Sequence, residues 1–173
     1  LATFWLFVLV TLLRPASPAI SSPAQLSAAP LDVVINEVAW SGTAASPWDE
    51  WLELYNNTTE TVPLGNWMIT ITGGISFTIP AGKSIAPGGY FLLERSDKAV
   101  SDITADHVYS SSKQISNIGG TVYLYNITGA LIDTANSSNT NWVTGTAAPD
   151  YKSMERINQS APDAISNWAT NDG

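Results

Sequence analysis

The sequence predicts one small all-β domain, built as a sandwich or a barrel. From Val33 onward, short runs of β-branched and aromatic residues alternate with Gly, Pro, Asn and Asp, a pattern typical of strands joined by turns. No stretch has a helical period long enough to compete with this reading. The chain has 173 residues, which suffices for one domain with a core but is short for two. We therefore expect a single domain.

Eight runs are predicted to form strands. Gly73-Gly74 separates the runs 67–72 and 75–79 and predicts a hairpin with a two-residue loop. Alternation in the run 51–55 places both leucines on one face and Trp51, Glu53 and Tyr55 on the other. The predicted strands are 33–40, 50–56, 67–72, 75–79, 89–94, 121–126, 131–135 and 152–157.

The N-terminal residues indicate export. Residues 1–13 are almost entirely apolar, too few to span a bilayer as a helix and typical of the apolar part of a secretory signal. The positive segment that should precede them is absent, so we expect that this sequence is clipped at its start; an uncleaved membrane anchor is the alternative. The predicted division is a truncated signal peptide at 1–19, a Pro-, Ser- and Ala-rich linker at 20–31, the sandwich at 32–158, and a tail or linker to a missing segment at 159–173.

Charge and cysteine content limit the classes of function. The net charge is −8, and removal of the leader with Arg14 lowers it by one, to −9. An acidic surface repels phosphate, so nucleic acid is not an expected partner. There is no cysteine, which excludes disulfides and thiolate chemistry in the oxidising setting that export implies. Stability must come from the core, to which seven tryptophans can contribute.

Several short motifs follow one another in a fixed order. They are INEVAW at 35–40, DEWLELYN at 49–56, LGNW at 64–67, IAPGGYFLL at 85–93, SNIGG at 116–120, LIDTA at 131–135, Trp142, and SMERI at 153–157. Taken together, this ordered set resembles the lamin tail domain family, in its bacterial secreted branch. The resemblance covers about 33–157, and it implies an immunoglobulin-like antiparallel β-sandwich.

The family resemblance also implies a role. It points to a non-enzymatic module, found alone or attached to secreted hydrolases, nucleases and surface proteins, with a protein or cell-envelope component as partner. In the lamins the domain contacts protein partners and chromatin, but the acidic charge here argues against nucleic acid. The family positions, expected to be structural and not catalytic or metal-binding, are Asn36, Glu37, Trp40, Glu50, Trp51, Glu53, Leu54, Trp67, Gly89, Tyr90, Asn117, Gly119, Trp142, Glu155 and Arg156.

Two residue sets are candidate catalytic centres. His107 is the single histidine, and no Gly-x-Ser-x-Gly accompanies it, so we expect a surface or edge-strand histidine. Asp49, Glu50 and Glu53 are near enough in sequence for a carboxylate pair, yet Glu50 and Glu53 point to opposite faces of a strand. We expect Asp49 and Glu50 to hold the strand end and Glu53 to pair with an arginine such as Arg95 or Arg156.

Two ligand classes remain as alternatives. Asp97, Asp102 and Asp106 could supply oxygen ligands to a structural calcium ion, although their spacing fits no EF-hand; no other cofactor is expected. Trp48 and Trp142 occur in loop-like surroundings and could form an aromatic platform for carbohydrate, whereas Trp40, Trp51 and Trp67 are expected in the core.

The sequence therefore predicts a secreted or surface-attached interaction or structural module. The first alternative is a carbohydrate-binding accessory module of a larger secreted hydrolase or nuclease, and the second is a carboxylate-dependent hydrolase. Exposed edge strands also leave self-association open.

Overall fold

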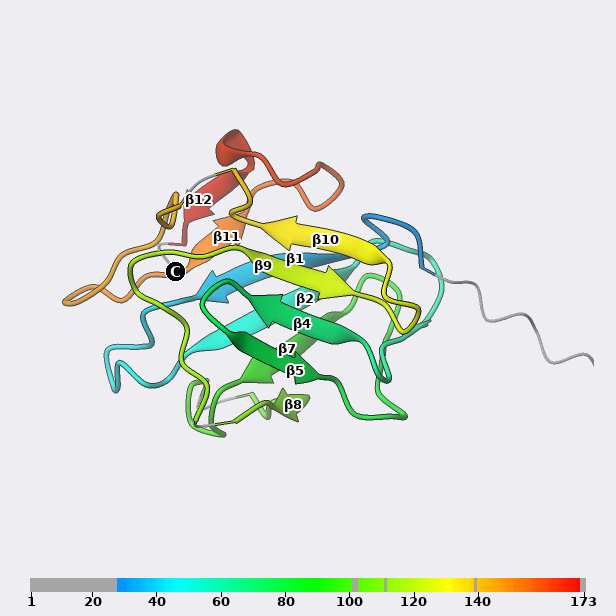
Figure 1. Cartoon of the computed structure of the whole chain (residues 1–173), viewed down its shortest axis with the longest axis horizontal. Coiled ribbons are helices and arrows are strands. Elements are labelled where there is room, and N and C mark those ends of the chain that lie inside the picture. The colour runs from blue at the N-terminus through cyan, green and yellow to red at the C-terminus, as the bar shows by residue number, and fades with distance from the viewer. Residues whose placement is uncertain (1–27, 101–102, 111, 139, 172–173) are drawn as a thin grey trace, which may run out of the picture.

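Two β-sheets packed face to face form the protein in the computed structural model (Figure 1). The structure describes residues 28–100, 103–110, 112–138 and 140–171. The larger sheet has six strands in the order β12 (Trp168–Thr170), β11 (Met154–Arg156), β1 (Val33–Ala39), β2 (Trp51–Asn56), β7 (Tyr90–Glu94) and β8 (His107–Val108). Its pairs are antiparallel except for β7 and β8, which run parallel.

The second sheet lies in front of the first in Figure 1 and has four strands. Their order is β10 (Leu131–Ala135), β9 (Val122–Tyr125), β4 (Met68–Ile71) and β5 (Ile75–Thr78). A separate pair joins β3 (Val62–Pro63) to β6 (Ser84–Ile85), and a 3-10 helix, η1 (Ile165–Asn167), precedes β12. The predicted immunoglobulin-like β-sandwich is confirmed, with all eight predicted strands present.

The core lies between the two sheets, because each strand buries one face. On β2 the two leucines, Leu52 and Leu54, belong to the core, while the other three side chains of the predicted run lie outside it. On β9 the core takes Val122 and Leu124. This alternation is the period-two pattern that the sequence displays.

A β-bulge at Asn36 explains the spacing of apolar residues on β1. Ile35 lies opposite Leu54 and Glu37 lies opposite Glu53, so Asn36 is the extra residue. Ile35 and Val38 are three apart and would point to opposite faces of a regular strand. The bulge turns both into the core and directs Glu37 to the outer face.

The structure corrects three details of the prediction. Ile71 pairs with Ile75 across the β4–β5 hairpin, so the loop has three residues and not the expected two. The sandwich also continues beyond residue 158: β12 lies in the expected tail and pairs with β11 through Arg156 and Trp168. At the other end, Leu31 in the predicted linker donates its N–H to the Ile132 carbonyl, so the domain also begins earlier than expected.

Arg156 connects the two sheets from β11. Its Nη2 lies 2.5 Å from Asp133 Oδ2 on β10, and both side chains are almost fully buried. Nε donates to the Ile35 carbonyl and Nη1 to the Ala161 carbonyl. The Trp168 ring lies 4.7 Å from the guanidinium carbon. A short three-residue strand therefore holds a cation between the layers, with hydrogen bonds to residues of both sheets.

The predicted signal peptide lies outside the described residues. Among the residues that the structure does describe, no helix is long and apolar enough to cross a membrane.

Candidate functional site

A groove with aromatic walls lies on the outer face of the six-stranded sheet, and we call it the sheet groove. Strand β2 contributes Trp51 and Glu53, and the adjacent strand β7 contributes Tyr90 and Leu92. These residues share a face because Glu53 lies opposite Leu92 in the antiparallel pairing. The segment after β7 completes the groove with Val100, Ile103 and Asp106. Its volume is about 310 Å³.

Apolar surface dominates the sheet groove, and much of it faces solvent. Leu92 forms the floor and is only 7% exposed, whereas Tyr90 is 55% and Ile103 60% exposed. The Tyr90 ring is supported by Tyr55, with ring centroids 5.0 Å apart. Asp106 is fixed at the edge, since its Oδ2 accepts the Leu92 N–H at 2.8 Å. The groove is thus a preformed apolar depression with a carboxylate on each side.

Three glutamates lie next to one another on this face, and we call them the glutamate row. Glu37 on β1 is directly opposite both Glu155 on β11 and Glu53 on β2. Burial raises the pKa of Glu37 and Glu53, and the charge of Glu155 adds to both increases. Three carboxylates at adjacent positions concentrate negative charge beside the groove. Like charges opposite each other in a sheet are unfavourable.

Neutral donors hold two members of the glutamate row, Glu37 and Glu53. Glu37 Oε1 accepts from the Ser153 hydroxyl and from Asn171 Nδ2, and Glu53 Oε1 accepts from Asn36 Nδ2 at 2.9 Å. Within the described ranges, the ion pairs are Arg95 with Glu50 and Arg156 with Asp133. No described lysine or arginine therefore neutralises the row.

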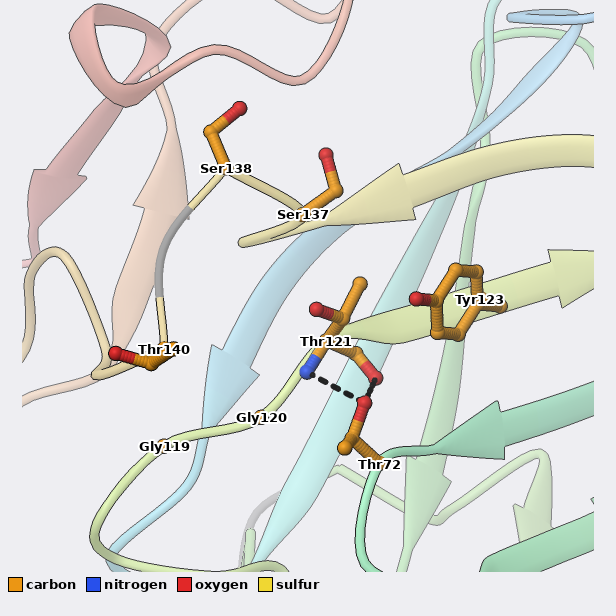
Figure 2. A pocket seen from close by; sticks show the side chains of 8 residues that line it. All are labelled: Thr72, Gly119, Gly120, Thr121, Tyr123, Ser137, Ser138 and Thr140. Carbon is orange, nitrogen blue, oxygen red and sulfur yellow. Dashed lines mark hydrogen bonds between the residues drawn. The ribbon is translucent and has the colours of Figure 1, made fainter.

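A second hollow, lined by hydroxyls, opens on the four-stranded sheet, and we call it the hydroxyl hollow (Figure 2). Tyr123 lines it from β9, and Thr72 and Thr121 line it from the positions just after β4 and just before β9. The segment after β10 adds Ser137, Ser138 and Thr140. Thr121 donates its N–H to Thr72 Oγ1 at 3.2 Å. Figure 2 shows the Tyr123 ring on β9 beside these hydroxyls.

A family model supports this architecture. A family model described as Lamin Tail Domain matches residues 27–138, more than half of the chain. The chain belongs to the lamin tail domain family. A search among curated proteins finds no match. Among solved structures, a DUF4876 family protein from Bacteroides thetaiotaomicron is similar, with a TM-score of 0.49 and 12% identity over 85% of this chain and 69% of that chain.

Several lamin tail motif residues lie in the interior. Leu54 and Trp67 are core residues. Trp40 donates its indole N–H to the Thr144 carbonyl and stacks on Trp142, with centroids 6.0 Å apart. Gly89 belongs to the turn before β7 and donates its N–H to the Ala86 carbonyl. Asn117, in contrast, is exposed in the loop before β9.

Two expectations from the sequence, for Trp51 and Glu53, are wrong, and one alternative, for Trp142, is not supported. Trp51 is not in the core but half-buried on the outer face, where its position beside Glu53 on the strand requires it to be. Glu53 bonds to Asn36 and not to an arginine. Trp142 is no open platform, because its ring stacks on Trp40 and its N–H bonds to the Ser116 carbonyl.

Trp48, His107 and Asp49 lie outside both hollows. Trp48 is 56% exposed, with the Arg95 guanidinium 5.0 Å from its ring. His107 lies on the edge strand β8, as expected, and burial together with Lys83 lowers its pKa. Asp49 accepts from the Thr43 hydroxyl at 3.4 Å.

The calcium alternative gains no support from the described residues. Asp106 is engaged with the Leu92 N–H, and Asp102 lies outside the described residues. In the part of the chain that the structure describes, no group of three or more His, Cys, Asp or Glu side chains is placed to hold a metal ion.

Gly119 is required by a close backbone approach at the hydroxyl hollow. A Cβ added there would lie 1.9 Å from the Thr140 carbonyl oxygen, and its φ is +155°. We expect Gly119→Ala to lower the free energy of unfolding by about 3 kcal/mol, because the Thr140 backbone must move. Gly129→Ala is the control: its φ is also positive, but nothing lies within 4 Å, so about 1 kcal/mol is expected. Equal losses in urea denaturation would show that the contact is relaxed.

Sequence reasoning identified part of the sheet groove and missed the rest. Alternation places Trp51 and Glu53 on one face of their strand, but no pattern in the sequence places Tyr90 beside them. The alternation in 90–93 puts Tyr90 and Leu92 on one face, and this signal, combined with pairing to β2, could have located the floor. Ile103 and Val100 come from an irregular segment whose path no pattern in the sequence fixes.

Proposed function

We propose that this lamin tail domain protein is a non-enzymatic interaction module of the cell exterior that binds a protein of the cell envelope through the sheet groove. The apolar segment at 1–13 supports export. Family membership supports a β-sandwich module. One observation carries the proposal: large apolar side chains, Tyr90 and Ile103, are exposed around a groove whose floor and walls are preformed.

Such a surface is suited to protein binding. Exposed apolar patches with polar rims mark interaction sites, and tyrosine and tryptophan dominate the binding energy of protein interfaces. Tyr90 is already packed against Tyr55, so little side-chain entropy is lost when a partner covers it.

The proposal is tested by capture from the organism's own envelope fraction, read by mass spectrometry. We expect a saturable protein partner whose capture falls at least tenfold in Tyr90→Ala, because an interface loses its anchor. Tyr125→Ala is the matched control, since Tyr125 is a half-buried tyrosine on β9 of the other sheet. Capture that is equal in wild type and Tyr90→Ala contradicts the proposal.

A second candidate is carbohydrate binding at the hydroxyl hollow, as an accessory module. It is favoured by the tyrosine ring beside several hydroxyls, which suits stacking and hydrogen bonding to a sugar (Figure 2). The same capture experiment separates the two functions. Retention of polysaccharide that is lost in Tyr123→Ala and kept in Tyr90→Ala supports the second candidate.

A further inference from the structure

We infer that the sheet groove receives the guanidinium of an arginine presented by the partner protein. The inference rests on the proposed function and names the chemical group that the groove recognises.

The charge around the groove calls for a cation. Glu53 and Asp106 line it, and Glu53 continues into the glutamate row through its pairing with Glu37. Among the described residues, no lysine or arginine forms an ion pair with any of these carboxylates. Burial raises the pKa of Glu53, and the charges of Glu37 and Glu155 add to the increase, against the hydrogen bond from Asn36. A cation bound here relieves this repulsion.

The apolar walls select an organic cation over a metal ion. Trp51 and Tyr90 present aromatic rings, and Leu92 closes the floor. Aromatic faces attract guanidinium and ammonium groups, whereas calcium takes six to eight oxygen ligands. The described residues offer no set of three such side chains around one point. A volume of about 310 Å³ is at the lower end for ligand sites and suits one long side chain.

In two places, the molecule itself holds an arginine guanidinium between a tryptophan ring and a carboxylate. Arg95 lies 5.0 Å from the Trp48 ring and 3.9 Å from Glu50. Arg156 lies over Trp168 at 4.7 Å and contacts Asp133. In the sheet groove, Trp51 and Glu53 supply the same two components on one strand face, and no described residue supplies the arginine.

The partner is a protein and not a free small cation, because the rim extends beyond one side chain. Tyr90 and Ile103 are exposed beside the groove, and only a larger surface can cover them. The net charge of −8 attracts a basic segment at long range. An arginine in the groove with apolar neighbours over the rim satisfies both features.

The test is a titration of the isotope-labelled protein with a blocked peptide, acetyl-Leu-Arg-Leu-amide, followed by NMR. We expect the largest shifts at the Trp51 indole N–H and the Leu92 amide. The same peptide with citrulline, a neutral isostere of arginine, should bind at least tenfold more weakly, and salt should weaken the arginine peptide. Equal affinity for both peptides would overturn the inference.

Two variants remove the charge of the groove. Glu53→Gln keeps an acceptor for Asn36, and Asp106→Asn keeps an acceptor for the Leu92 N–H. Each should weaken the arginine peptide fivefold or more and leave the citrulline peptide unaffected. Glu60→Gln is the control, because Glu60 is exposed. If only one of the two variants folds, that variant decides the test.

The two proposals fail differently. If envelope capture depends on Tyr90 but both capture and arginine-peptide binding are unchanged in Glu53→Gln, the cation inference is wrong and the interaction module stands. If capture does not depend on Tyr90, both are wrong. Binding of acetyl-Leu-Lys-Leu-amide tenfold more tightly than the arginine peptide would also overturn the assignment of arginine.

Discussion

Replacing Arg156 by methionine should lower the free energy of unfolding by about 3–5 kcal/mol, because the change leaves a buried carboxylate without its counter-ion. Asp133 contacts Arg156 at 2.5 Å with almost no exposure of either side chain. The substitution also removes the donors to the Ile35 and Ala161 carbonyls. Urea denaturation at neutral pH measures the loss. A cost below 1 kcal/mol would contradict this account.

A double variant separates the effect of the unpaired Asp133 charge from the effect of lost packing. In Arg156→Met/Asp133→Asn the charge is gone, and the asparagine oxygen can still accept the Ile35 N–H that Asp133 Oδ2 accepts at 2.8 Å. We expect the double variant to be more stable than Arg156→Met alone by 1 kcal/mol or more. If the stability losses of Arg156→Met and Asp133→Asn simply add in the double variant, the unpaired carboxylate is not the cause of the loss.

The sequence predicts the fold well because its signals are local. Alternation identifies β2 and β9, and glycines mark the hairpin between β4 and β5. The shortest strands, β3, β6 and β8, have two residues each, too few for any period to appear. Their pairing comes from tertiary packing.

The candidate site is harder to predict because it depends on register. Glu37 and Glu53 are neighbours only because the bulge at Asn36 shifts the pairing by one residue. Glu155 joins them from a strand more than a hundred residues away in sequence. The misplacement of Trp51 was avoidable, since its alternation with Leu52 already assigns it to the outer face.

The second large effect concerns Glu50, whose titration should make the protein less stable as pH rises. Glu50 is fully buried, and its Oε2 accepts the Ile115 N–H at 2.8 Å. Its Oε1 and the nearby Tyr109 hydroxyl are buried without a partner among the described residues. Burial raises the pKa of Glu50 to about 7, against the opposing effects of Ile115 and Arg95.

The sign follows from proton binding in the two states. In the unfolded chain Glu50 has its ordinary pKa of 4.5, so between pH 4.5 and about 7 the folded protein keeps a proton that the unfolded chain releases. Unfolding then releases a proton, and rising pH favours it. The stabilisation is present below pH 4.5 and is lost by about pH 7, a change of about 3 kcal/mol.

Glu50→Gln removes this titration and keeps an acceptor for the Ile115 N–H. The amide also places a donor at the buried position where Oε1 has no partner, near the Tyr109 hydroxyl. Comparing the variant with wild type from pH 5 to pH 8 isolates Glu50 from the other raised carboxyls, Glu37, Glu53, Glu94 and Asp133. We expect the free energy of unfolding of Glu50→Gln, relative to wild type, to rise by about 2 kcal/mol or more from pH 5 to pH 8. Glu60→Gln should follow wild type. Parallel curves for Glu50→Gln and wild type would mean that Glu50 is charged in the folded protein throughout, with Arg95 and the Ile115 N–H sufficient to hold it.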